Sequence, residues 1–282
     1  MIRHTRKLLT LATLGLLAGC NAGGGIDTAQ LTPILGAQNA HALGAAAHGW
    51  NAITIGPQQE NAIGESVGIA ITNRYPLVPS DDLQKYVMLV GLTVANASPN
   101  PGLPWVFGVI DSPDINAFSG PNGYVFITKG ALKQMRSEAE LAGVLAHEVG
   151  HVCAHDGLEQ VKAAEQRGAL SEAVQAGGSQ TSQFSALADL GVDVLTKQAY
   201  SQPQELKADA AAVHIMSGAG YDPAAYLQFL QRMQGISAGG AVLSTHPNIG
   251  LRVQTVSREM SGVKRGGATL ADRFAYNARL AG

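Results

Sequence analysis

The chain has 282 residues, of which 46% are hydrophobic and 14% are charged, and its formal net charge at pH 7 is -2. This composition is typical of a globular protein with a large core. The near-neutral charge and the lack of a basic patch argue against nucleic-acid binding. Two cysteines in the whole chain exclude a disulfide-based scaffold.

The first twenty residues have the pattern of a bacterial export signal. Basic residues precede an apolar run at 8–17, which is too short to span a bilayer. The run ends in Leu-Ala-Gly-Cys at Cys20, which resembles a lipoprotein cleavage site. We therefore expect residues 1–19 to be a lipoprotein signal peptide and Cys20 to carry the lipid that anchors the chain to a membrane. An ordinary signal peptide with a chance cysteine is the alternative.

The rest of the chain divides by composition. Residues 20–56 are rich in Ala, Gly, Asn and Gln and lack hydrophobic periodicity, so we expect a flexible tether. Residues 57–262 hold the periodic segments and the motifs, and we expect them to form one catalytic domain. A short amphipathic tail, 263–282, follows it.

Within that domain, apolar spacing and cap residues predict several helices, and β-rich runs predict a small sheet. The expected helices are 57–74, 81–97, 129–134, 138–155, 158–176, 184–200, 203–216, 222–233 and 247–260. The expected strands are 105–110, 115–118 and 124–128, and a Gly-Pro-Asn-Gly turn signal separates the last two. This order predicts an α+β, mainly helical fold with a sheet of three to four strands.

The segment 138–155 carries the clearest chemical motif. It contains His147, Glu148 and His151 in the order His-Glu-x-x-His. Residues four apart share one face of a helix, so both imidazoles can bind one metal ion. Glu148 lies beside this pair, within reach of a water molecule. The arrangement is typical of zinc-dependent hydrolases.

The alternative is a solvated helix face with two unrelated histidines. The apolar flank at 141–145 argues against it, because a buried helix needs partners for its polar side chains. Cys153 should point away from the ligand face and act as a small core residue.

A catalytic zinc ion usually has three protein ligands and one open position. On the helix 203–216, Glu205 and Asp209 share a face, so Glu205 is a candidate third ligand. Asp209 could then accept a hydrogen bond from the far ring nitrogen of His147 or His151. The alternative is that both carboxylates face solvent and pair with lysines.

Several motifs together resemble the M48 family of zinc metalloendopeptidases, in its bacterial envelope branch. The matching segments are Asn116-Ala117-Phe118, 124–128 with Gly130, 145–152 with His155, 205–209 with Ala212, 218–223, and Thr245-His246-Pro247 with Arg252. The resemblance covers about 57–262 and implies a thermolysin-like topology. It also implies one zinc ion bound by His147, His151 and Glu205.

The chain departs from the family pattern in two places. Gln202 stands where the family usually has arginine, three residues before the ligand glutamate, and Ala212 stands where glycine is commoner. The first change removes a charge that often supports the site.

Hydrolysis of a peptide bond at such a zinc site requires further residues, and the sequence offers candidates for them. Glu148 is the expected general base and then general acid. His246, by resemblance, either stabilises the oxyanion or binds the open zinc position and blocks the enzyme; a loop histidine that caps the following helix is the alternative. Arg252 is expected to form a supporting salt bridge. His155 lies too far along the helix for the same zinc ion, so we expect a structural hydrogen bond there.

An extended peptide should pair as an added strand with the edge formed by Asn116, Ala117 and Phe118. The sequence therefore predicts a lipid-anchored endopeptidase on the periplasmic side of the bacterial envelope, acting on misfolded or unassembled proteins. The cysteine is followed by Asn21 rather than aspartate, and by resemblance to the bacterial lipoprotein sorting pattern this favours the outer membrane over the inner one. The alternatives are a zinc-fold chaperone or binding factor with little turnover, blocked by His246, and a zinc hydrolase of another class, such as a deformylase.

Overall fold

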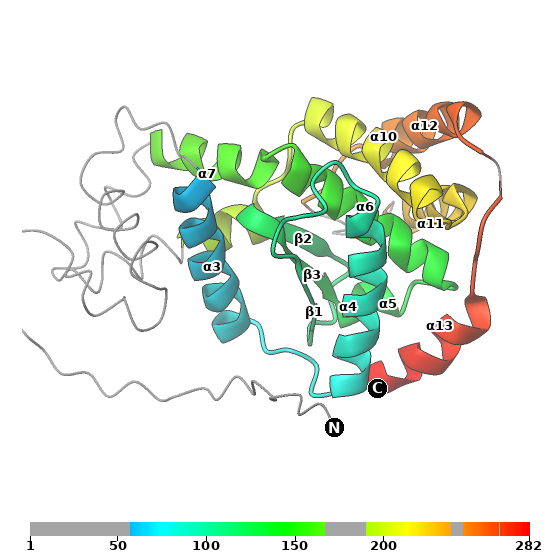
Figure 1. Cartoon of the computed structure of the whole chain (residues 1–282), viewed down its shortest axis with the longest axis horizontal. Coiled ribbons are helices and arrows are strands. Elements are labelled where there is room, and N and C mark those ends of the chain that lie inside the picture. Colours follow the sequence, from blue (N-terminus) through cyan, green and yellow to red (C-terminus); the bar gives the residue numbers. More distant parts are fainter. Residues whose placement is uncertain (1–56, 167–189, 238–244, 265) are drawn as a thin grey trace, which may run out of the picture.

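The computed structural model describes residues 57–166, 190–237, 245–264 and 266–282 (Figure 1). The predicted signal peptide, the lipidation site Cys20 and the tether 20–56 lie outside these residues, as do large parts of the helices expected at 158–176 and 184–200. No helix in the described ranges has the length and apolar character needed to cross a bilayer.

The described part is mainly helical, as predicted. Its helices are α3 (Pro57–Arg74), α4 (Asp81–Asn96), α5 (Lys129–Leu132), α6 (Glu138–Cys153), α7 (Asp156–Gln166), α10 (Gln202–Gly218), α11 (Pro223–Ser237), α12 (Ile249–Glu259) and α13 (Ala271–Ala278). Residues 190–197 are also helical. The strands are β1 (Val106–Ile110), β2 (Ala117–Gly120) and β3 (Tyr124–Thr128).

The sheet has three strands in the order β1-β3-β2. Strand β3 pairs in parallel with β1, with Val106 opposite Tyr124, and antiparallel with β2, with Ala117 opposite Ile127. A short 3-10 turn, Pro121–Gly123, joins β2 to β3, where the sequence predicted a hairpin. The α+β prediction is therefore confirmed, and β2 lies at one edge of the described sheet.

The sheet separates two apolar layers. Residues such as Val109, Ala117 and Ile127 pack toward α4 and α6, in the larger core. Ile110 and Phe118 face the other side and pack with α3 and with residues 190–197. In Figure 1, α3 and α4 accordingly lie on opposite sides of the strands.

Helix α6 is the most deeply buried element. Ser137 caps it by accepting a hydrogen bond from the Glu140 backbone N–H. The two glutamates in its first turn interact favourably with the positive end of the helix dipole. Every residue from Glu138 to Val152 is buried. The His-Glu-x-x-His motif is therefore part of the core.

Two glycines allow neighbouring helices to approach α6 closely. A Cβ atom at Gly143 would come within 2.6 Å of the Tyr226 side chain on α11, and one at Gly150 would come within 3.2 Å of the Ala208 backbone on α10. Because α10 lies so near to α6, its carboxylates can reach the histidines of the motif.

The C-terminal segment packs behind the same helix. Phe274 of α13 is buried, and Arg273 pairs with Glu138, which is fully buried at the start of α6. The hydroxyls of Tyr86 and Tyr221 also donate to Glu138, over 3.0 and 2.7 Å. The segment therefore fixes the N-terminal end of α6.

Candidate metal centre

Four side chains from three separate parts of the chain converge on one point. The Nε2 atoms of His147 and His151 lie 3.1 Å apart. Glu205 Oε1, from α10, lies 3.3 Å from His151 Nε2. His246 Nδ1 lies 2.9 Å from Glu205 Oε1 and 3.2 Å from His147 Nε2. The structure thus brings together the three predicted ligands and places His246 beside them.

The spacing of these donors fits a metal ion. Their ligand atoms all lie within 4.8 Å of one another. Zinc bound tetrahedrally at about 2.0–2.1 Å requires donors separated by roughly 3.3 Å, close to the spacing found here. Glu205 Oε2 is buried and has no hydrogen bond of acceptable geometry among the described residues, although Arg252 Nη1 lies 3.2 Å away as an ion-pair partner. A bound cation would satisfy this carboxylate and the converging imidazole nitrogens.

Each histidine of the motif has a carboxylate behind it. Asp209 Oδ1 lies 3.0 Å from His147 Nδ1, on the side of the ring away from the cluster, as the sequence suggested. Asp156 Oδ2 lies 2.8 Å from His151 Nδ1. Such contacts fix the tautomer and the orientation of a metal-binding imidazole. The second carboxylate, Asp156, was not anticipated.

Asp156 reaches this position because α6 ends before it. His155 has a positive φ of 58°, so the chain turns sharply and α7 begins at Asp156. The Gln204 side chain then donates to Asp156 Oδ1 over 3.1 Å. His155 is not on the ligand face of α6; it bonds Glu60 on α3 over 2.8 Å, the structural role that was expected.

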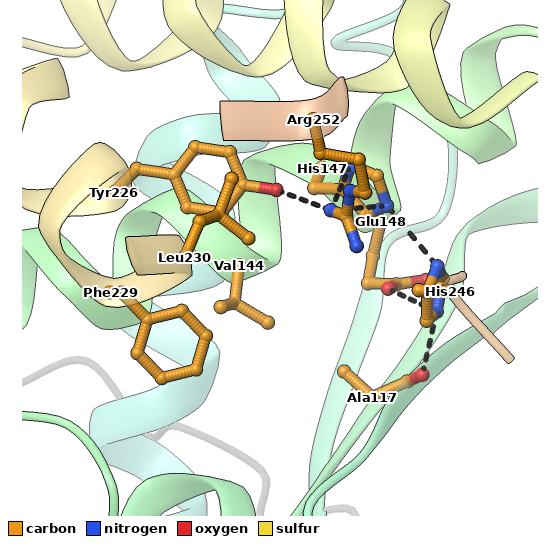
Figure 2. Close-up of a pocket in the computed structure, with 9 residues that line it drawn as sticks. All are labelled: Ala117, Val144, His147, Glu148, Tyr226, Phe229, Leu230, His246 and Arg252. Atoms are coloured by element: carbon orange, nitrogen blue, oxygen red, sulfur yellow. Dashed lines mark hydrogen bonds and ion pairs between the residues drawn. The ribbon is translucent and has the colours of Figure 1, made fainter. Parts of the chain in front are cut away.

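A buried polar network surrounds Arg252, and Figure 2 shows its members Arg252, Tyr226 and His147. Arg252 donates to both oxygens of Asp209 at 2.9 Å and pairs with Glu205 Oε2 at 3.2 Å. The Tyr226 hydroxyl donates to Asp209 over 2.8 Å. These groups lie in the core, where each charge requires the others as partners. Arg252 therefore supports the carboxylates of the cluster directly.

Burial and the neighbouring charges shift the pKa values of the cluster in opposite directions. Burial, with Arg252 acting in the same sense, lowers the pKa of His147 to about 4. Burial also opposes charge on His151, but hydrogen bonds to Asp156 and Glu205 outweigh it and raise that pKa to about 9. A bound dication would replace the proton of His151, because metal ligands must be deprotonated.

Burial also opposes ionisation of both carboxylates from α10, but nearby positive charge outweighs it. His246 and Arg252 hold the pKa of Glu205 well below its usual range. Arg252 and His147 do the same for Asp209. Both carboxylates are therefore anionic at neutral pH.

Glu148 points to the space between the cluster and the sheet edge. Its Oε2 accepts a hydrogen bond from the Ser119 hydroxyl over 2.8 Å, and its Oε1 lies 3.3 Å from His246 Nε2. His246 Nε2 also lies 3.1 Å from the Ala117 carbonyl oxygen on β2. Figure 2 shows His246 between Glu148 and Ala117.

A small cavity adjoins these residues. Val144, Phe229 and Leu230 supply its apolar wall, opposite His147 and Glu148 (Figure 2). Its volume is about 10 Å³, which is near the minimum needed for one water molecule. The centre is therefore closed around the motif in this conformation.

One aromatic side chain packs directly on the cluster. Tyr200 stacks on His151 with ring centroids 4.0 Å apart, a contact that the sequence did not indicate.

Two further residues lie outside the cluster. Cys153 is half-buried and packs against the core, as expected. The His214 side chain is 58% exposed and takes no part in the cluster.

The fold and the site define a zinc metallopeptidase: a buried His-Glu-x-x-His helix, a glutamate on a second helix and a small sheet whose edge adjoins the centre. Residues 81–260 match the model of peptidase family M48. The chain belongs to this family, whose enzymes depend on zinc.

Similar proteins carry consistent names. The Beta-barrel assembly-enhancing protease of Escherichia coli is 26% identical over 266 residues, covering 88% of this chain and 51% of that protein. Metalloprotease YcaL of Escherichia coli is 25% identical over 268 residues, covering 93% of this chain and 100% of that protein. Mitochondrial metalloendopeptidase OMA1 of Arabidopsis thaliana is 30% identical over 153 residues, covering 52% of this chain and 30% of that protein. The chain thus spans about half the length of the first of these relatives.

Proposed function

We propose that this protein is a zinc-dependent endopeptidase that hydrolyses peptide bonds in extended, misfolded or unassembled envelope proteins. The observation that carries the proposal is the convergence of His147, His151 and Glu205 beside Glu148. Membership in family M48 supports it.

The residues divide the work as follows. His147, His151 and Glu205 would hold the zinc ion, which would supply Lewis acidity to a water molecule and to the scissile carbonyl. Glu148 takes the proton from the attacking water and delivers it to the leaving amine nitrogen. Ser119 holds the Glu148 carboxylate in place through its 2.8 Å hydrogen bond. Asp209 and Arg252 keep the ligands oriented.

The substrate is proposed to bind along the outer edge of strand β2. The Asn116 carbonyl accepts from Thr128 N, within the sheet, whereas the Ala117 carbonyl faces outward to His246. A peptide in extended form can replace that contact with its own backbone N–H. Only unfolded or unpaired segments offer a free extended backbone, so the edge selects them.

The N-terminal pattern and the names of the relatives support a proposed location in the bacterial cell envelope. A lipid on Cys20 would tether the domain to the periplasmic face of a membrane, with the outer membrane favoured. The name of the Escherichia coli relative refers to β-barrel assembly, and outer-membrane barrels that fail to assemble expose unpaired strands. We propose such chains as substrates.

His246 holds the enzyme in a closed form in this proposal. Its Nδ1 lies 2.9 Å from Glu205 Oε1, within the cluster, and its Nε2 lies 3.1 Å from the outward carbonyl oxygen of Ala117. Both the metal position and the substrate edge are then blocked by one side chain. In the open form, the same imidazole would be free to stabilise the oxyanion.

A casein assay tests the main proposal. The chain should cleave casein internally, a zinc chelator should stop cleavage, and added zinc should restore it. The Glu148→Gln variant should lose about a hundredfold to ten-thousandfold in rate, because general acid-base catalysis contributes that much. Binding of unfolded casein with no chelator-sensitive cleavage would instead favour the chaperone-like alternative.

His246→Ala separates the two roles of this histidine. If it mainly blocks the centre, the variant should cleave casein faster than the unaltered chain. If it mainly stabilises the oxyanion, the rate should fall by about a hundredfold or more. The closed geometry leads us to expect a gain, measured as initial rate at saturating zinc.

A further inference from the structure

We propose that a cavity on the far side of β2 binds a lysine or arginine side chain of the substrate. This inference rests on the proposed endopeptidase function, because it assumes a peptide paired with the β2 edge. It adds a selectivity for basic residues that the metal centre itself does not provide.

The cavity lies under the sheet, on the side of α3 rather than of α6. Its volume is about 240 Å³. Ile110 and Phe118 line it and belong to the apolar layer shared with α3, and Thr128 lies at the end of β3. The volume equals that of roughly eight waters in the liquid, so it suits one long side chain rather than a cofactor.

Strand geometry directs a substrate side chain toward this cavity. Successive side chains of a strand point to opposite faces of a sheet, and residues directly opposite each other point to the same face. Ala117 packs toward α6, whereas Asn116 and Phe118 line the cavity. The substrate residue opposite Ala117 therefore points to the metal side, and its neighbour at the Asn116 end points to the cavity.

Asn116 relates the cavity to the edge where the substrate is proposed to bind. Asn116 lines it and also accepts a hydrogen bond from the Thr245 hydroxyl over 3.0 Å. Thr245 directly precedes His246, which covers the edge in the closed form. Movement of this segment would therefore expose the edge and the Asn116 side of the cavity together.

The lining selects the chemical class of the side chain. Ile110, Ile115 and Phe118 offer apolar walls for an aliphatic stem. Asp114 is the one charged residue among the described residues that line the cavity. The Ser112 hydroxyl donates to its carboxylate over 3.1 Å. Ser112 and Asp114 lie on the loop between β1 and β2. Lys129, which follows β3 next to this loop, is already paired with Asp111. A cation therefore finds an anion and no competing positive charge in the lining.

Peptide libraries read by mass spectrometry would test this. Each peptide carries one cleavage site, and lysine, glutamine or glutamate is placed in turn at each position around it. For the unaltered chain we expect lysine to be favoured over glutamine about two- to fivefold at one position, the size of a partly exposed charge pair. The preference should shrink at high salt.

Variants of Asp114 test whether its carboxylate causes the lysine preference. Asp114→Asn should abolish the lysine preference, and Asp114→Lys should shift it toward glutamate. Asp82→Asn is the control, because it removes the same charge from an exposed position outside the cavity lining and leaves the pair of Lys129 with Asp111 intact. Its lysine preference should persist. Anisotropy measurements with fluorescent peptides on the Glu148→Gln variant give the same comparison without turnover.

The outcomes separate the two proposals. Chelator-sensitive cleavage with no lysine preference, or with a preference that survives in Asp114→Asn, would overturn the cavity assignment alone. Absence of any chelator-sensitive cleavage, together with failure to bind any of the peptides, would overturn both it and the endopeptidase proposal.

Discussion

At the scale of single residues, Asp209 and Asp156, the carboxylates that contact the outer ring nitrogens of the two motif histidines, influence the affinity for the metal. Asp156 is the clearest test, because it contacts His151 and Gln204 but is not one of the candidate ligands. Asp156→Ala should lower zinc affinity about ten- to a hundredfold, as loss of such a partner typically does. Competition with a chromophoric chelator measures this directly.

Glu159→Ala is the control for that measurement. It removes an exposed carboxylate from the same helix, α7, where Glu159 pairs with Lys162 instead of the cluster. Zinc affinity should remain within about twofold of that of the unaltered chain. Equal affinities for Asp156→Ala and the unaltered chain would refute the role of Asp156 in positioning His151.

The sequence could supply the three proposed ligands but not Asp156. A fixed spacing on one helix identifies His147 and His151, and the resemblance identifies Glu205. Asp156 acts only because His155 adopts a left-handed conformation and ends the helix early. No periodicity encodes such a break, since histidine carries no strong preference for it.

At the scale of elements, the C-terminal segment contributes to the stability of the metal helix. Arg273→Ala would leave the fully buried Glu138 carboxylate with only two tyrosine hydroxyls. We expect the free energy of unfolding to fall by about 1–3 kcal/mol, the usual cost of an under-satisfied buried polar group. Urea denaturation followed by circular dichroism measures the change.

Arg279→Ala is the matched control, because it removes an exposed arginine from the end of the same segment. Its unfolding free energy should change by about 0.5 kcal/mol or less. If Arg273→Ala is equally mild, α13 does not stabilise α6 through this pair.

The elements themselves could largely be predicted, whereas their neighbours in space could not. Strand β3 matches the expected strand 124–128, because a run of residues that favour β-strands ends there and a helix follows directly. The parallel pairing of β1 with β3, which leaves β2 at the edge, depends on contacts that skip one strand in the chain. Local patterns carry no information about such pairing.

At the scale of the whole molecule, the metal should contribute to stability. The cluster joins α6, α10 and the segment at His246, so zinc binds the folded state and not the unfolded one. Zinc at about a thousand times its dissociation constant would add about 4 kcal/mol. Thermal unfolding should therefore shift to a clearly lower temperature with chelator and recover with added zinc.

The Glu148→Gln variant should show the same thermal shift, because this residue is not a proposed ligand. His147→Ala should show little or none. A melting temperature independent of zinc in the unaltered chain would contradict metal binding at this site.

The closed edge of β2 also bears on how the protein behaves at high concentration. An exposed strand edge is a template on which other chains assemble, so it promotes aggregation. The segment at Thr245 and His246 covers that edge in the closed form. If the edge binds unpaired strands of substrates, as proposed, covering it also prevents two copies of the protein from pairing, and opening the cover lowers solubility as it allows activity. The His246→Ala variant should accordingly self-associate at concentrations where the unaltered chain stays monodisperse.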